Sequence, residues 1–409
     1  MSVQVIEGGI TSPKGFKAAG VKCGIKKDKL DLAVIYTEMP AVAAMAYTQN
    51  RARAAPIEVM IRDSPRTLRA FVINSGNANA LTGPKGIEDA EAMRTSVALP
   101  LGLEPIEVGV ASTGVIGRFL PMDKVTSGIA QAVKQLDRGT EADMEAAKAI
   151  MTTDTRVKSF ACHVTLGDGT VATIAGIAKG SGMISPAMRT MHATTLSFIA
   201  TDACVQGDVS IQWQRIIDSS FNVINVDGDQ STNDISAFMA NSAAGGAPAD
   251  DDPALWEGVL HIAQSLSKAV VVDGEGATKL IEVVVTGAKD DNEARAAARS
   301  VVASNLVKAA VFGADPNFGR ILAALGNSGS DFDISKVRLT LKNGRTVVLF
   351  EQGSPVIVPG SPDENVARAI LREKRIMVLL ELGVGNGKGE AWGCDLSYEY
   401  VHINASYTT

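Results

Sequence analysis

The segment Lys179–Ala203 contains the residues whose types and spacing best suit chemistry. It begins with Lys-Gly-Ser-Gly-Met, a turn rich in glycine and serine, and continues through Thr194 and Thr195 into a run that is typical of a strand. A threonine hydroxyl is a weak nucleophile that needs an adjacent base before it attacks a carbonyl carbon. The residue types alone indicate only a loop that leads into a strand, and most loops of this kind do no chemistry.

The same segment resembles the signature of the ornithine acetyltransferase family, the bifunctional enzymes of arginine biosynthesis. In that family a Lys-Gly-Ser-Gly-Met-Ile-x-Pro-x-Met segment precedes an Ala-Thr pair whose peptide bond is broken autocatalytically. The resemblance covers almost the whole chain, in blocks that follow the family's order. The other blocks are Ser12–Gly20, Ile73–Ala80, Ser112–Gly117, Ile150–Asp154, Asp227–Asp234, Gly274–Lys279, Asp315–Arg320 and the tail Tyr400–Thr409.

One departure from the family pattern lies beside the expected scissile bond. The family runs from the last methionine directly into Ala-Thr, whereas here Arg189–His192 are inserted. Thr190 keeps the spacing from Lys179, while Thr194 keeps the preceding Ala193 and the spacing to the strand. We favour Thr194, because the nucleophile must stand at the start of a rigid strand. Residues before the cut become a free chain end, where an insertion is tolerable.

Cleavage between Ala193 and Thr194 would create the base that the threonine needs. The new α-amine has an ordinary pKa of about 8 and is therefore partly neutral at pH 7. The resemblance then implies a ping-pong reaction, in which Thr194 takes acetyl from N-acetylornithine and passes it to the amine of glutamate. Some members of the family also use acetyl-CoA as a co-substrate, and no feature of this sequence separates the two cases. No cofactor is expected.

The resemblance also implies which groups surround the nucleophile. Acyl transfer needs an oxyanion hole, which the hydroxyl of Thr113 and the backbone N–H of Gly114 would form, since glycine lets backbone approach closely. Lys179 suits a substrate carboxylate and Glu275 a substrate ammonium group. The implied substrate-binding residues are Thr152, Lys179, Thr194, Glu275, Asn404 and Thr409. Asn404 and Thr409 require the C-terminal tail to fold into the site.

Composition and charge exclude several classes of protein. The 409 residues are 46% hydrophobic and 21% charged, which is ordinary for a globular protein. A net charge of −6 argues against a nucleic-acid partner, and no apolar run approaches the roughly 18 residues that a membrane span needs. The N-terminus has no signal-peptide or transit-peptide pattern, so we expect a cytoplasmic location. The scattered cysteines and histidines lack metal-ligand spacing, which predicts no metal.

Alternating strands and helices predict an α/β (α+β) fold with layered sheets. In the first part, the expected strands are 32–36, 70–73, 171–178 and 195–201, and the expected helices are 122–136, 142–151, 211–221 and 255–270. From about residue 280 we expect a smaller α/β domain. Its elements are strand 279–286, an Ala-rich helix 292–308, strands 337–341 and 346–350, and strand 376–382. Asn343-Gly344 between two of these strands indicates a hairpin with a type I′ turn.

The resemblance implies an N-terminal-nucleophile-type fold and a particular division of the chain. Cleavage would give fragments 1–193 and 194–409, which stay together and pair as α2β2. Structurally, residues 1–279 would form the catalytic core, and 280–409 the smaller domain with the tail that reaches the site.

Two other motifs have weaker interpretations. Gly383–Gly389 superficially resembles a phosphate loop, but it is not followed by a helix pattern, and a turn into another strand is the better interpretation. Asp227–Asp234 is acidic yet lacks the spacing of an EF-hand loop. We expect instead a structured loop rich in hydrogen bonds from side chains to backbone.

Two alternative functions stay open. The acyl acceptor could be water, which would make the protein a Thr-nucleophile amidase or aminopeptidase. The insertion at 189–192 could instead abolish cleavage and leave an inactive protein that binds acyl-amino acids.

Overall fold

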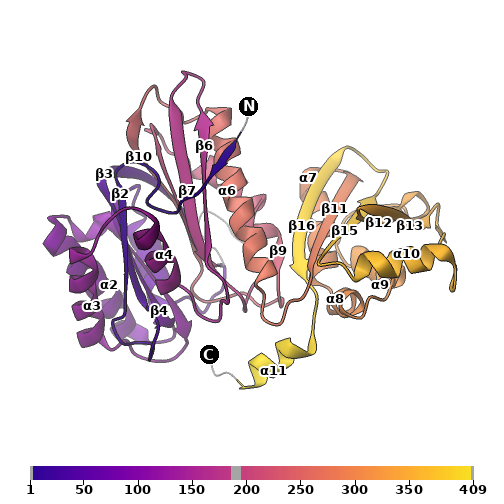
Figure 1. The fold of residues 1–409 in the computed structure, drawn as a ribbon, viewed down its shortest axis with the longest axis horizontal. Coiled ribbons are helices and arrows are strands. Elements are labelled where there is room, and N and C mark those ends of the chain that lie inside the picture. Colours follow the sequence, from indigo (N-terminus) through magenta and orange to yellow (C-terminus); the bar gives the residue numbers. More distant parts are fainter. Residues whose placement is uncertain (1–2, 186–194, 407–409) are drawn as a thin grey trace.

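A computed structural model of the chain describes residues 3–185 and 195–406 and contains two β-sheets, each covered by helices (Figure 1). The larger sheet has nine strands, in the order β1-β6-β7-β8-β10-β3-β4-β5, with β2 also paired to β3. These strands are β1 (Gln4–Ile6), β2 (Phe16–Val21), β3 (Leu32–Tyr47), β4 (Thr67–Asn77), β5 (Val108–Val115), β6 (Lys158–Thr165), β7 (Val171–Lys179), β8 (Leu196–Ala203) and β10 (Ile235–Gly245).

The long strand β3 joins the two halves of this sheet. Its first part, Leu32–Tyr36, pairs with β2 and β4, and its last part pairs with β10. The register with β4 shifts between Tyr36 and Ala41, a stretch that contains Pro40, which has no N–H to donate to a ladder. The halves fold toward each other: Phe71 of β4 packs edge-on against Phe198 of β8 at 4.8 Å, although β10 and β3 lie between those strands.

Strand β8 lies in the middle of the sheet, antiparallel to β7 and parallel to β10. Every residue from Leu196 to Ala203 is buried. Alternate side chains point to opposite faces of a strand, so Phe198 joins one core cluster and Ile199 the other. A strand that is buried along its whole length is typical of a sheet covered on both faces.

Helices form the outer layers of the first domain. Helix α6 packs against β6 and β7, and α5 against α6, while the remaining helices pack against β2–β5 or against one another. Their bounds are α1 (Ala55–Asp63), α2 (Gly83–Leu101), α3 (Met122–Lys134), α4 (Thr140–Ala149), α5 (Ser210–Asp218) and α6 (Pro253–Val272), with short 3-10 turns at Pro105–Glu107 and Phe221–Val223.

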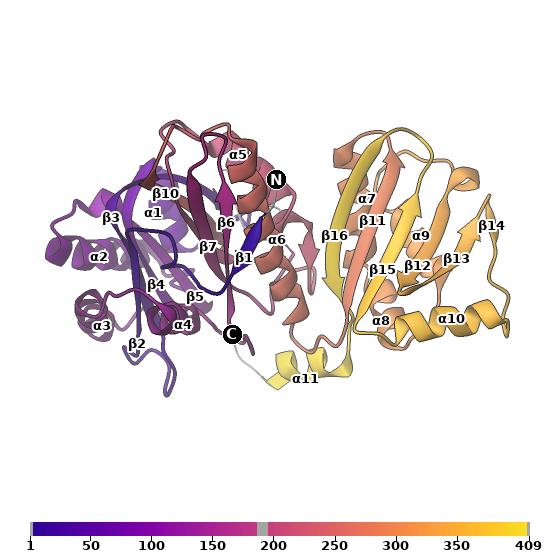
Figure 2. The ribbon, with the colours of Figure 1, turned by 45° about the horizontal axis from the view of Figure 1, so that its top comes forward.

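The second sheet has seven strands in the order β14-β13-β12-β15-β11-β16-β9 and lies beside the first domain (Figure 2). Its strands are β9 (Ile224–Asn225), β11 (Leu280–Ala288), β12 (Arg338–Asn343), β13 (Arg345–Glu351), β14 (Ser354–Pro355), β15 (Arg375–Glu381) and β16 (Gly387–Cys394). Its helices are α7 (Asp291–Ala303), α8 (Asn305–Phe312), α9 (Phe318–Gly326) and α10 (Pro362–Leu371), with a 3-10 turn at Ile334–Lys336. The last helix, α11 (Tyr398–Ser406), runs back toward the first domain.

The α/β fold with layered sheets and a smaller C-terminal domain is confirmed, with two local corrections. The helix expected at 292–308 is broken at Ser304, whose side chain accepts a hydrogen bond from Val307 N and starts a second helix. The hairpin at Asn343-Gly344 exists, but only Gly344 has a positive φ, of 62°. The type I′ turn was therefore wrong, because that turn needs two such residues. None of the described helices is long and apolar enough to cross a membrane.

Candidate active site

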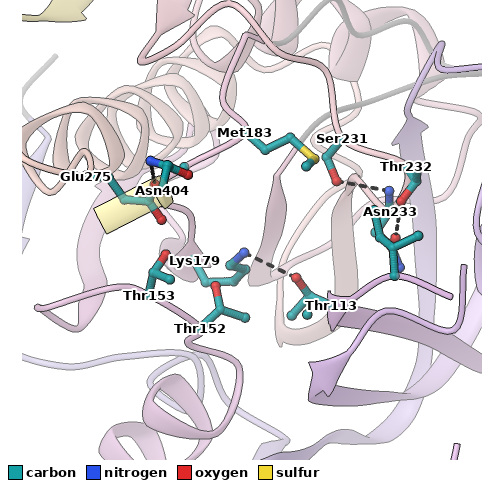
Figure 3. A pocket seen from close by; sticks show the side chains of 13 residues that line it. Thr113, Thr152, Thr153, Lys179, Met183, Ser231, Thr232, Asn233, Glu275 and Asn404 are labelled. Atoms are coloured by element: carbon teal, nitrogen blue, oxygen red, sulfur yellow. Dashed lines mark hydrogen bonds between the residues drawn. The ribbon is translucent and has the colours of Figure 1, made fainter. Parts of the chain in front are cut away.

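A pocket of about 660 Å³, open to solvent, lies where the ends of β5 and β7 meet the loops of the first domain and helix α11 (Figure 3). It is lined mainly by small polar residues, with one lysine and one glutamate. The lining residues are Thr113, Gly114, Ile116, Thr152, Thr153, Lys179, Gly182, Met183, Ser231, Thr232, Asn233, Glu275 and Asn404.

Thr113 and Gly114 lie near the end of β5, which runs parallel to β4. Gly114 has a φ of 131°, and a Cβ built there would lie 2.3 Å from the carbonyl carbon of Gly76. Only glycine fits, so its peptide lies directly against β4. The Asn233 side chain fixes this strand end, since its Nδ2 donates to Ser112 O at 2.8 Å and to Ala78 O at 2.5 Å.

Lys179 is the last residue of β7, and its Nζ donates a hydrogen bond to Thr113 Oγ1 at 3.2 Å. Because the ammonium donates, the hydroxyl hydrogen of Thr113 stays available for a group in the pocket. Lys179 is only 9% exposed. Burial lowers its pKa, against the opposing effect of the nearby carboxylates of Asp154, Asp234 and Glu275.

A buried ion network supports the wall behind Lys179. Lys158 Nζ lies 2.6 Å from carboxylate oxygens of both Asp154 and Asp273. Asp154 also accepts hydrogen bonds from the N–H groups of Thr152, at 2.9 Å, and Gly180, at 2.7 Å. Burial alone would raise the pKa of Asp154, but Lys158, Lys179 and the Gly180 N–H hold it at about 2.

Glu275 and Asn404 lie at the other end of the pocket from Asn233 (Figure 3). Glu275 N donates to Ser181 O at 2.9 Å, which ties its backbone to the loop that follows β7. Asn404 Nδ2 donates to Glu275 Oε2 at 2.9 Å. The C-terminal helix therefore reaches the site and orients the carboxylate.

The structure brings most of the sequence-predicted site residues into this one pocket. Thr113, Gly114, Thr152, Lys179, Glu275 and Asn404 all line it. The predicted nucleophile Thr194, its alternative Thr190, the cleavage residue Ala193 and the tail residue Thr409 lie outside the described residues. The roles assigned to all of these residues stay predictions.

Several lining residues were missed by the sequence analysis. Gly182 and Met183 lie inside the block that begins at Lys179, but nothing in their type singled them out. Ser231–Asn233 belong to the acidic segment that we interpreted as a structured loop, and that interpretation is correct for Asn233, which bonds two backbone carbonyls. Within the described ranges, no group of three or more His, Cys, Asp or Glu side chains is placed to hold a metal ion.

Comparisons with known proteins match the whole chain to one family. The sequence model of the ArgJ family matches residues 17–409. The arginine biosynthesis bifunctional protein ArgJ of Caldanaerobacter subterraneus is 45% identical over 420 residues, covering 100% of both chains. The protein of the same name from Bacillus subtilis is 44% identical, over 99% of this chain and 97% of its own.

Among solved structures, one similar chain is ornithine acetyltransferase from Mycobacterium tuberculosis, complexed with ornithine. It is 42% identical, covers 46% of this chain and 100% of its own, and has a TM-score of 0.43. A crystal structure of arginine biosynthesis bifunctional protein ArgJ from Bacillus halodurans is also 42% identical, with a TM-score of 0.44, and covers 46% of this chain and 98% of its own.

Proposed function

The chain belongs to the ArgJ family, and on that premise we propose that it is a glutamate N-acetyltransferase that takes acetyl from N-acetylornithine. The acetyl group is carried as an ester of Thr194, which becomes the nucleophile when the chain cuts itself between Ala193 and Thr194. The observation that carries the proposal is the hydrogen bond from Lys179 to Thr113 beside Gly114, because the Thr113 oxygen accepts it and the hydroxyl hydrogen can be donated to a developing oxyanion.

Each half-reaction follows from these groups. The hydroxyl oxygen of Thr194 attacks the acetyl carbonyl carbon, and its proton passes to the new α-amine. The oxyanion of the tetrahedral intermediate accepts hydrogen bonds from Thr113 and Gly114. The C–N bond then breaks, the amine nitrogen of ornithine takes the proton, and ornithine leaves. The amine of glutamate attacks the remaining ester in the same way and restores the hydroxyl.

The charges of the pocket suit amino-acid substrates. Lys179 offers a cation for an α-carboxylate and Glu275 an anion for the side-chain ammonium of ornithine, and Thr152 lies beside Lys179 (Figure 3). Both charged groups are nearly buried, at 9% exposure each. An ion pair with substrate is stronger in such a site than in water.

The names of the relatives support a second activity. Several of them are called bifunctional, and we propose that acetyl-CoA can acetylate the same threonine, so that glutamate is also acetylated without N-acetylornithine. We further propose that the two fragments assemble as α2β2 and that the reaction takes place in the cytoplasm. A light-scattering mass equal to one protomer would count against the assembly.

The first test is the intact mass of the purified protein under denaturing conditions, followed by N-terminal sequencing. The proposal expects two fragments, one of which begins at Thr194. A fragment that begins at Thr190 would move the nucleophile. An uncut chain that binds N-acetylornithine without turnover would favour an inactive binder.

The second test is acetyl exchange between N-acetylornithine and labelled glutamate. The proposal expects labelled N-acetylglutamate to form. Release of acetate that does not depend on glutamate would indicate an amidase instead. Absence of any exchange by cut protein would refute the proposal.

A further inference from the structure

The loop of residues 227–234 holds the backbone on both sides of the segment that contains the proposed scissile bond. Its first residue, Asp227, contacts the chain before that segment, and its last residue, Asp234, contacts the chain after it. The segment itself, residues 186–194, lies outside the described part of the chain. Both contacts are made by carboxylates to backbone N–H groups.

Asp227 holds the upstream side. Its Oδ2 accepts a hydrogen bond from Met183 N at 2.6 Å, and its Oδ1 accepts one from Ile184 N at 2.9 Å. The backbone nearby adds a third bond, because Val226 N donates to Ile184 O at 2.7 Å. Burial raises the pKa of Asp227 in spite of these donors. The hydrogen bonds from Met183 N and Ile184 N fix the position of the Asp227 side chain.

Asp234 holds the downstream side. Its Oδ1 accepts a short hydrogen bond from Thr195 N, and the next residue, Ile235, donates from N to Thr195 O at 3.0 Å. Asp234 is 5% exposed, and its Oδ2 has no hydrogen-bond partner among the described residues. Burial raises its pKa well above the ordinary range. A buried carboxyl oxygen without a partner is costly in a folded protein and calls for a reason.

The two backbone positions that these aspartates hold are strained. Met183 has a φ of 58° and Thr195 a φ of 116°, values that residues with a Cβ rarely adopt and that are least favourable for a β-branched residue such as threonine. Strained residues persist only where the surrounding structure over-determines them, and they cluster at functional sites. Here the N–H of each strained residue donates a hydrogen bond to an aspartate of the same loop.

We propose that the loop 227–234 is a positioning clamp for self-cleavage and for the nucleophile. Asp234 fixes the N–H of Thr195, which belongs to the peptide bond that joins Thr195 to the proposed nucleophile Thr194. Asp227 fixes Met183, which lines the substrate pocket. This inference rests on the proposed function, because it assumes a cut before Thr194. After the cut both aspartates belong to the second fragment, so Asp227 then holds Met183 and Ile184 of the first fragment from the other polypeptide.

The different positions of the two aspartates give different kinetic signatures. Misplacing a reactive group by about 1 Å can slow a reaction on the order of 10²-fold. Asp234→Ala should therefore slow self-cleavage by about that factor and lower the kcat of the cut fraction, with KM within about threefold of wild type. Asp227→Ala should also slow cleavage, by roughly tenfold, but should raise KM for N-acetylornithine roughly tenfold with little change in kcat, because the pocket wall is released.

Two further variants make the comparison specific. Asp234→Asn keeps an oxygen that can accept from Thr195 N, so it should cleave within about threefold of wild type. Asp229→Ala removes an exposed aspartate of the same loop and should match wild type in cleavage, kcat and KM. Cleavage is followed by intact mass against time after synthesis of the full chain, and acetyl exchange gives kcat and KM.

The outcomes separate the clamp from the function on which it rests. If wild type is cut and exchanges acetyl, but Asp234→Ala and Asp227→Ala behave like Asp229→Ala, the clamp is overturned and the proposed function stands. If wild type is neither cut nor active, the proposed function is refuted, and the clamp, which rests on it, is refuted with it. Should Asp234→Ala not fold, Asp227→Ala decides the question by its KM, and Asp234→Asn decides it by its cleavage rate.

Discussion

The ammonium group of Lys179 lies 3.2 Å from the hydroxyl oxygen of Thr113, although four strands separate β7 from β5 in the order of the sheet. In a flat sheet five strand spacings would place these strands roughly 24 Å apart. The contact exists because β3 changes partners along its length and the two halves of the sheet face each other. The site therefore lies where the two halves of the sheet face each other.

Removal of the Thr113 hydroxyl should impair catalysis more than binding. Thr113→Val leaves the strand intact but removes one proposed oxyanion donor, which typically lowers kcat by roughly 10²- to 10³-fold. Steady-state acetyl exchange by cut enzyme measures the effect, with KM expected to change by only a few-fold. Thr95→Val in helix α2, whose hydroxyl donates to Glu91 O of the same helix, serves as the control. A kcat equal to that of wild type would remove Thr113 from the mechanism.

The crowding around Gly114 predicts that a single added carbon atom strongly lowers the free energy of unfolding. In Gly114→Ala the new Cβ would overlap backbone of β4, with 2.3 Å to Gly76, and we expect a loss of about 3 kcal/mol in the free energy of unfolding. Gly117→Ala is the matched control, since Gly117 also has a positive φ, of 78°, but nothing lies within 4 Å of its Cβ position. It should cost only roughly 1 kcal/mol. Urea unfolding of both variants makes the comparison, and equal losses would contradict it.

The buried ion network predicts a large cost for the loss of its cation. Lys158→Met removes the cation that Asp154 and Asp273 share, and breaking a buried ion pair by removing one partner typically costs about 3–5 kcal/mol. Lys148→Met in helix α4, where the lysine is exposed, should change stability little. Denaturant unfolding at neutral pH tests both. A small effect at Lys158 would mean that water or rearrangement compensates the two carboxylates.

The pKa of Asp154 predicts acid sensitivity over a defined range. Its folded-state pKa is held at about 2, below the ordinary 3.8. A carboxyl whose pKa is lowered by folding contributes stability above its ordinary pKa, and that contribution disappears as pH falls through the folded value. Stability should therefore drop by about 2 kcal/mol between pH 4 and pH 2 on account of this group. Asp154→Asn should show a drop smaller by that amount, and an unchanged drop would refute the assignment.

The contact of the C-terminal helix with the pocket predicts an effect on substrate affinity. Asn404→Ala removes the hydrogen bond that orients the Glu275 carboxylate, and a hydrogen bond to a charged group contributes about 1.5–3 kcal/mol. KM for N-acetylornithine should rise roughly tenfold with kcat within about twofold. His402→Ala changes an exposed residue of the same helix and provides the control. If both variants have the same KM, the helix does not act on substrate through Asn404.

The elements that could be predicted from the sequence are those whose apolar residues recur at the spacing of a helix or a strand. The strand from 171 and the helix from 122 follow directly from the spacing of their apolar residues. The break at Ser304 was missed because the alanine-rich pattern continues across it. A serine in such a pattern can lie within one helix or cap the next, and the structure shows that Ser304 caps a second helix.

The site could not be assembled from periodicity, because its residues come from strand ends and loops. The proximity of Lys179 and Thr113 depends on how β3 bends, and nothing local to either residue encodes that bend. Family resemblance placed both in one site before the fold was known. It could not indicate the contacts of Asp227 and Asp234, since an aspartate that caps a loop and one that holds a strained peptide have the same appearance in sequence.

The pairing of β8 has a consequence for the order of events in the life of the protein. After a cut before Thr194, β8 and β10 belong to the second fragment, whereas their neighbours β7 and β3 belong to the first. The pair β8–β10 of the second fragment then lies between β7 and β3 of the first, and it cannot leave without breaking the ladders on both of its edges. In the proposed self-cleavage, folding therefore comes before cutting. A protein unfolded after maturation would have to find its structure as a two-chain, concentration-dependent reaction, which the uncut chain never faces.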